Sequence, residues 1–97
     1  MHIREFQELI EETYFERDSA RGRDRTFLWF VEEVGELARA LARPPDRTGK
    51  NLREEFADVL AWLSTLASIE GISLEEVACA KYGKGCPKCG TKPCRCP

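Results

Sequence analysis

Apolar side chains recur every three or four positions over the first three quarters of this chain. No stretch alternates apolar and polar residues with the period of two that a strand requires. The pattern therefore predicts an all-α fold, a four-helix bundle whose helices are joined by short loops. With 97 residues, 42% of them hydrophobic, the chain has the size and the apolar content of one small globular domain.

Caps and breakers predict where these helices begin and end. The first helix is expected over about 3–17, ahead of a polar loop over 18–23. Asp24 is the expected N-cap of the second helix, and Pro44 and Pro45 are expected to stop it. The stripes expected to face the core are Ile3, Phe6, Leu9, Ile10, Thr13 and Tyr14 on the first helix, and Phe27, Phe30, Val31, Val34, Leu37, Ala38 and Leu41 on the second.

Two further caps predict the remaining helices. Asn51 stands three residues before Glu54, which predicts that it caps the third helix, and Gly71 is expected to close that helix. Ser73 stands three residues before Glu76 and is expected to cap a short fourth helix.

The composition changes after Gly83. Residues 84–97 have almost no apolar side chains, so the sequence predicts a helical domain over 1–83 and a cysteine-rich C-terminal knob over 84–97. Four thiols at Cys-x-x-Cys and Cys-x-Cys spacing favour structural Zn²⁺ in a cytosolic protein, with disulfides or a mobile thiol-rich tail as alternatives. The four are Cys86, Cys89, Cys94 and Cys96. Cys79, on the fourth helix, is expected to be a small buried apolar residue.

Charge and hydropathy exclude two classes of partner. The net charge of -2 does not support binding to a nucleic-acid polymer. The apolar runs are far shorter than the roughly 20 residues of a membrane span, and the first residues do not resemble a signal peptide. A cytoplasmic location is therefore expected. The composition, rich in arginine and poor in amides, favours a thermophilic host.

Two acidic pairs with the same spacing lie on the second and third predicted helices. Helix geometry places Glu33 and Glu36 on one flank of the second helix, and Glu55 and Asp58 on the matching flank of the third. If the helices pack antiparallel, four carboxylates face one another, and such a group needs a cation such as Mg²⁺ or Mn²⁺.

A more ordinary interpretation is open for either pair alone. Each fits a solvated helix face whose carboxylates pair with Arg39 or Arg53. A tryptophan lies four residues from each pair, Trp29 before Glu33 and Trp62 after Asp58. Such a ring can stack on a planar ligand, or it can cover the core or a subunit interface.

Residues 32–38 (EEVGELA) and 54–60 (EEFADVL) resemble the paired E-E-x-x-E and E-x-x-D signature of the MazG-like, all-α nucleoside triphosphate pyrophosphohydrolases. Residues 71–76 are similar to the family's segment after the third helix, and the similarity covers roughly residues 5 to 82. The resemblance implies an enzyme that cleaves a nucleoside triphosphate to the monophosphate and pyrophosphate. The resemblance also implies that this enzyme uses Mg²⁺ held by four acidic residues.

Matching positions in the motif assigns roles to residues of this chain. The implied metal ligands are Glu33, Glu36, Glu55 and Asp58, and Glu32 takes the position proposed to activate the attacking water. Phosphoribosyl-ATP pyrophosphatase of histidine synthesis shares the acidic pattern and is the nearest alternative. An alternative of another class is a non-catalytic oligomeric helical module with a zinc-binding tail.

Basic side chains and surplus apolar surface predict phosphate contacts and self-assembly. Candidate phosphate-binding side chains, each of them also compatible with plain surface charge, are Arg21, Arg23, Arg25, Lys81 and Lys84. The chain carries more apolar surface than one small bundle can cover, which predicts a homodimer or a homotetramer. The residues behind this expectation are Leu52, Val59, Leu63 and Leu66.

Overall fold

The helices are seen in a computed structural model that describes residues 1–43 and 50–97. They are α1 (Ile3–Arg21), α2 (Arg23–Ala42), α3 (Lys50–Ile69) and α4 (Leu74–Tyr82). Within the described ranges there is no strand, so the predicted all-α class is confirmed.

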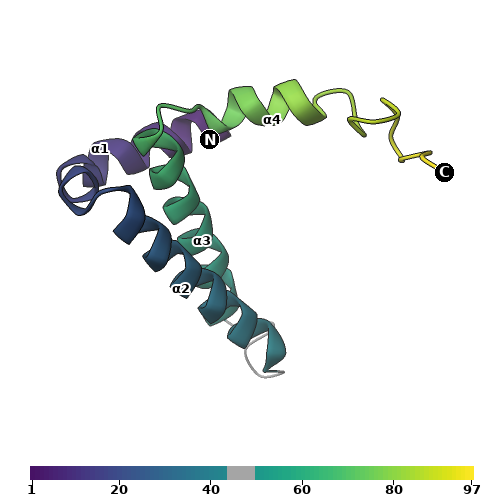
Figure 1. The fold of residues 1–97 in the computed structure, drawn as a ribbon. Coiled ribbons are helices and arrows are strands. Elements are labelled where there is room, and N and C mark those ends of the chain that lie inside the picture. Colours follow the sequence, from purple (N-terminus) through teal and green to yellow (C-terminus); the bar gives the residue numbers. More distant parts are fainter. Residues whose placement is uncertain (44–49) are drawn as a thin grey trace.

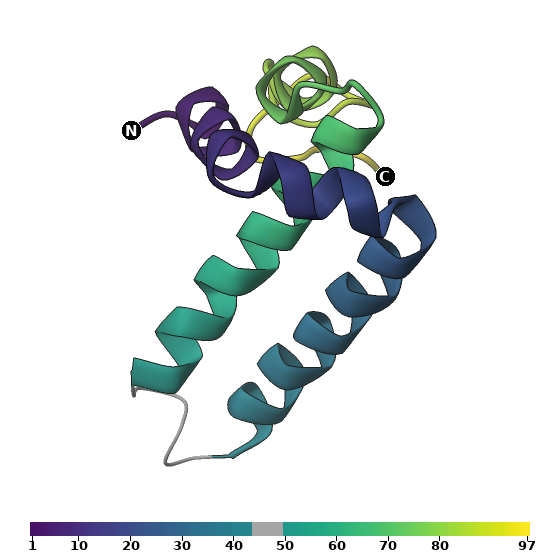
Figure 2. The same cartoon turned by 90° about the vertical axis from the view of Figure 1, so that its left-hand side faces the viewer.

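α2 and α3 form an antiparallel hairpin that makes most of the contacts between helices (Figures 1 and 2). α1 lies across the end of this hairpin where α2 begins and α3 ends, and it contacts every other helix. α4 packs against α1, and the chain after α4 extends away from the hairpin (Figure 1). In the part of the chain described, no single helix is long and apolar enough to cross a membrane, and α3 with α4 reaches that threshold only as a pair bent by 98°.

The corner between α1 and α2 differs from the predicted polar loop. α1 continues to Arg21, because Asp18 turns inward and is held by hydrogen bonds from Arg21 and Thr65. Gly22, with φ 82°, makes the break between the two helices. α2 then begins directly at Arg23, so the predicted N-cap, Asp24, lies inside its first turn, and that prediction is wrong.

The start of α3 also differs from its predicted cap. The helix already includes Lys50, so Asn51 has a helical backbone and is not the N-cap. A helix that begins upstream leaves the asparagine side chain without the orphan N–H groups that a cap satisfies. The predicted stop of α2 at Pro44 and Pro45 lies outside the described residues, although α2 does end ahead of it, at Ala42.

The turn from α3 to α4 has the predicted caps. Gly71 has φ 69°, and the Ile72 N–H donates to the Ala67 carbonyl at 2.8 Å, which closes α3 in a Schellman motif. The Ser73 hydroxyl then accepts a hydrogen bond from the Glu76 N–H at 3.3 Å and caps α4. Short-range capping chemistry therefore fixes this turn.

A buried glutamine fastens α1 to the same turn. Gln7 Nε2 donates to Ser68 Oγ at 3.1 Å and to the Ile72 carbonyl at 2.8 Å. Its Oε1 accepts from the Leu74 N–H at 2.9 Å. The amide thus uses both donors and its acceptor, which offsets the cost of its burial.

The apolar stripes of α1 and α2 are not buried within the chain. Of the hydrophobic residues in the described ranges, only Ala40 and Ala67 are buried. Phe27 is 53% exposed and Val31 is 49% exposed, because α2 packs against α3 along one flank and no other helix in the described ranges covers its stripe. The stripe residues that prove exposed are Ile3, Leu9, Thr13, Tyr14, Phe27, Val31, Val34, Ala38 and Leu41, while Phe6, Ile10, Phe30 and Leu37 are half-buried.

Candidate functional site

The antiparallel hairpin brings carboxylates of α2 and α3 together. Glu33, Glu55 and Asp58 each present a carboxylate oxygen, and these oxygens all lie within 4.8 Å of one another. The fourth predicted ligand, Glu36, is not among the three, but its charge acts on both Glu33 and Glu55 from one turn further along α2. We call these four residues the acidic cluster.

Two oxygens of the acidic cluster are buried without a hydrogen-bond partner. They are Glu33 Oε2 and Glu55 Oε2. Loss of water raises the pKa of Glu33 from 4.5 to about 7, and the charges of Glu36, Asp58 and Glu55 add to this effect. Desolvation, followed by the charge of Glu36, also raises the pKa of Glu55. A site that withholds water and partners from carboxylates is suited to a hard cation.

The arginine pairs expected under the more ordinary interpretation do not form, although Glu36 and Asp58 are exposed. Within residues 1–43 and 50–97, no ion pair joins Glu33, Glu36, Glu55 or Asp58 to Arg39 or Arg53. The remaining predicted site residue, Glu32, is exposed one position before Glu33 and lies outside the group of three converging oxygens.

The raised pKa of Glu33 predicts how the metal-free protein responds to pH. The folded chain holds this proton more tightly than the unfolded chain, so its stabilising effect is complete below pH 4.5 and is lost as the pH rises through about 7. Glu33→Gln has no such proton, so melting curves in EDTA should show its stability rising relative to the parent as the pH increases from 4.5 to about 7. Above about pH 7 the difference in stability should stay constant. A difference that does not vary with pH would contradict the burial of this carboxyl.

The two tryptophans meet beside the acidic cluster. Trp29 of α2 and Trp62 of α3 pack edge to face with ring centroids 5.5 Å apart. The Arg21 guanidinium lies 4.6 Å from the Trp29 ring centroid and 4.8 Å from that of Trp62. These side chains line a pocket of about 270 Å³ that also includes Asp58, so the pocket and the acidic cluster share a wall.

A buried polar network positions Arg21 there. Its Nη1 donates to Asp18 Oδ1 at 3.1 Å and to Thr26 Oγ1 at 3.4 Å, and Thr65 Oγ1 donates to Asp18 Oδ2 at 3.2 Å. The side chains of Asp18 and Arg21 are each only 11% exposed. Sequence reasoning placed Arg21 in a loop as a candidate surface charge. The i, i+3 spacing of Asp18 and Arg21 was the available signal for a helical ion pair.

The other candidate phosphate-binding residues do not line this pocket. Arg23 lies 3.1 Å from Glu70, and the Lys81 ammonium lies 5.4 Å from the Tyr82 ring centroid. Arg25 and Lys84 are exposed. Of the five predicted cations, only Arg21 lines the pocket beside the acidic cluster.

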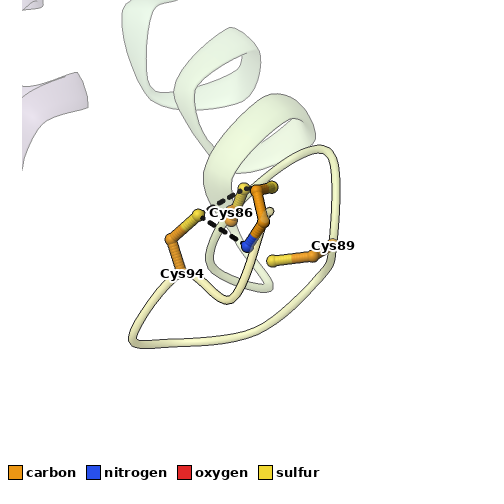
Figure 3. A group of neighbouring side chains, drawn as sticks. Cys86, Cys89 and Cys94 are labelled. Carbon is orange, nitrogen blue, oxygen red and sulfur yellow. Dashed lines mark hydrogen bonds between the residues drawn. The ribbon is translucent and has the colours of Figure 1, made fainter.

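The four cysteines of the C-terminal knob also converge. Their sulfurs all lie within 4.8 Å of one another, and Figure 3 shows the labelled side chains turned toward a common centre. The group could hold a metal ion, and we call it the cysteine cluster: Cys86, Cys89, Cys94 and Cys96. Cys79, predicted to be buried, is exposed instead, because α4 has no buried residue.

Comparison with known proteins agrees with this geometry. A family model of the MazG nucleotide pyrophosphohydrolase domain matches residues 21–90, which is more than two thirds of the chain. The match includes both acidic segments and Trp29 and Trp62, and it begins later and ends later than the resemblance estimated from the motifs. No curated protein matches the chain. The acidic motifs and the length of this match show that the chain belongs to the MazG nucleotide pyrophosphohydrolase family.

Proposed function

We propose that this protein hydrolyses nucleoside triphosphates to the nucleoside monophosphate and pyrophosphate, and that it requires Mg²⁺. The family supports a nucleotide pyrophosphohydrolase in general. The observation that carries the proposal is a pair of buried carboxylate oxygens without a hydrogen-bond partner, on Glu33 and Glu55, two residues whose carboxylates converge across the hairpin.

The donor set of the acidic cluster fits Mg²⁺ or Mn²⁺, because both ions prefer carboxylate oxygens. Glu33, Glu36, Glu55 and Asp58 would hold the ion. When bound, Mg²⁺ supplies positive charge that offsets the triphosphate charge and makes water more acidic. Glu32, exposed on α2 next to the cluster, is the carboxylate proposed to accept the proton of the attacking water.

The tryptophan pocket is proposed to receive the nucleoside. Its aromatic walls, Trp29 and Trp62, offer ring faces and edges to a planar base. Arg17 and Arg21 line the same pocket and bring positive charge next to Asp58 of the acidic cluster. A ligand that spans both regions would place its base on the aromatic rings and its phosphates toward the carboxylates.

An assay of pyrophosphate release separates this proposal from its alternatives. The panel should contain canonical and damaged nucleoside triphosphates and phosphoribosyl-ATP, each with Mg²⁺ and with EDTA. Turnover of nucleoside triphosphates only with Mg²⁺ is the expected result. A preference for phosphoribosyl-ATP would favour the histidine-synthesis enzyme, and no turnover of any substrate would favour the non-catalytic module.

We also propose that the protein works as a homo-oligomer in the cytoplasm. Phe27, Leu28 and Leu66 line one open apolar hollow, and more than half of the surface of Phe27 and of Leu28 is exposed. An exposed apolar stripe of this extent is typical of a subunit interface. A second copy that covers it would supply the core that one chain lacks.

Light scattering at micromolar concentration tests this assembly. The parent should scatter as a homodimer or homotetramer of an 11.1 kDa chain, and Leu28→Glu should shift it toward the monomer, because a charge would be buried in the interface. The control is Val77→Glu on α4, which is exposed but lies outside this stripe and should leave the mass unchanged. A monomeric parent would refute the assembly.

A further inference from the structure

We propose that the cysteine cluster binds one Zn²⁺ through four thiolates and that this metal holds residues 84–97 in their folded form. The site is separate from the acidic cluster, lies beyond α4 and does not depend on the proposed hydrolysis. Figure 3 shows its setting, in which the chain loops back so that Cys94 approaches Cys86.

The sulfur positions match a single tetrahedral ion. Cys86 Sγ lies 3.6 Å from both Cys94 Sγ and Cys96 Sγ, and all four sulfurs lie within 4.8 Å of one another. A zinc–sulfur distance of about 2.3 Å places tetrahedral sulfurs about 3.8 Å apart. Disulfide formation would instead draw the sulfurs into two separate pairs at about 2.05 Å. The sulfurs gather around one centre, as metal ligands do.

Backbone amides support the sulfurs in this arrangement. The Arg95 N–H donates to Cys89 Sγ at 3.3 Å, and the Cys96 N–H donates to Cys94 Sγ at 3.4 Å. Such donors stabilise thiolates and orient metal ligands in the same way as other outer-shell hydrogen bonds.

The fold of the knob needs a cross-link of this kind. Its turn is closed by hydrogen bonds from the Cys86 N–H to the Thr91 carbonyl at 3.0 Å and from the Gly90 N–H to the Cys86 carbonyl at 2.6 Å. Apart from cysteine and proline, residues 84–97 contain no apolar side chain. Burial of a hydrophobic core therefore cannot offset the conformational entropy that this segment loses when it folds. A structural metal supplies folding free energy to such segments.

The local charge is also suited to a zinc tetrathiolate. One Zn²⁺ with four thiolates carries a charge of about −2. Residues 84–97 contain no Asp or Glu and have four basic side chains that surround the cysteines in the sequence: Lys84, Lys88, Lys92 and Arg95. These basic side chains therefore offset the negative charge of the zinc complex.

Elemental analysis of the purified full chain tests the proposal, with unreduced mass measured in parallel. We expect about one zinc per chain after dialysis, and a mass that shows no disulfide. A thiol-specific mercurial should release this zinc from the parent protein in proportion to the thiols modified. That measurement needs no variant and stands even if a variant fails to fold.

Three variants test which residues hold the zinc. Cys86→Ser with Cys89→Ser should reduce the zinc to below about a fifth of the parent value, because two of four ligands are lost. Cys79→Ser is the matched control, since this exposed cysteine lies on α4 outside the cluster, and it should keep the full zinc content. Glu33→Gln should also keep it, which separates this site from the acidic cluster.

Three results would overturn the proposal. The first is a zinc content that the double serine variant does not lower, or that Glu33→Gln removes. The second is a zinc-free protein whose mass is lower by about two hydrogen masses per disulfide bridge. The third is a zinc-free protein with four free thiols in residues 84–97. The second and third results would not bear on whether the acidic cluster hydrolyses nucleotides, because the hydrolysis assay is read independently.

Discussion

Replacing Asp58 with alanine is expected to abolish Mg²⁺-dependent hydrolysis while the helix content stays intact. Asp58 is exposed on α3, so its removal leaves no cavity in the core. It is also the residue shared by the acidic cluster and the tryptophan pocket. Removing a group that only supports a metal ligand costs about 10- to 100-fold in activity, so loss of a proposed ligand should cost at least about 100-fold in kcat.

Asp24→Ala is the matched control for this variant. Asp24 is another exposed aspartate of the hairpin, but it lies near the start of α2, where its carboxylate is 3.9 Å from Arg23. The control should keep the kcat of the parent, and both variants should keep its circular dichroism. Parental turnover by Asp58→Ala would remove Asp58 from the proposed ligand set. Glu36→Ala should behave as Asp58→Ala does.

A large effect on stability is expected from Asp18→Ala. The carboxylate of Asp18 receives hydrogen bonds from Arg21 and Thr65 in a setting where the Arg21 side chain is only 11% exposed. Breaking a buried ion pair from one side leaves the other charge without its partner, which costs about 3 kcal/mol. Urea denaturation should show a loss of free energy of unfolding of this size at a fixed protein concentration.

Glu70→Ala provides the comparison at the surface. It breaks the Arg23–Glu70 ion pair, which has the same 3.1 Å distance, but the two side chains are 67% and 40% exposed. An exposed pair of this kind contributes about 0.5 kcal/mol. If both variants lose the same free energy of unfolding, burial does not make the Asp18–Arg21 ion pair more stabilising than an exposed pair.

The sequence predicted the features that depend on local chemistry. Helical periodicity gave the all-α class, and the caps at Gly71 and Ser73 were found because a cap is made by residues within one turn. The repeated acidic spacing also indicated which carboxylates would meet, since α2 and α3 turn the same flank of each motif toward the other. Glu33, Glu55 and Asp58 do converge in the structure, whereas Glu36, which the same spacing predicts with them, is not part of that group of three.

Tertiary contacts explain what the sequence did not predict. Residues 18–21 looked like a polar loop because the partner of Asp18, Thr65, lies 47 positions away in the sequence. Gln7 binds the turn between α3 and α4 through contacts that are equally remote along the chain. The apolar stripe of α2 was expected to be buried because periodicity identifies a face that must be covered, but not whether the same chain or another covers it.

Phosphorus NMR of the products formed from a nucleoside triphosphate, with Mg²⁺ and with EDTA, is the most direct measurement of the proposed chemistry. With Mg²⁺, the parent protein should convert the triphosphate to equal amounts of nucleoside monophosphate and pyrophosphate, and with EDTA the triphosphate should persist. Formation of nucleoside diphosphate and orthophosphate, or cleavage that continues unchanged in EDTA, would contradict metal-dependent cleavage between the α and β phosphates by the acidic cluster.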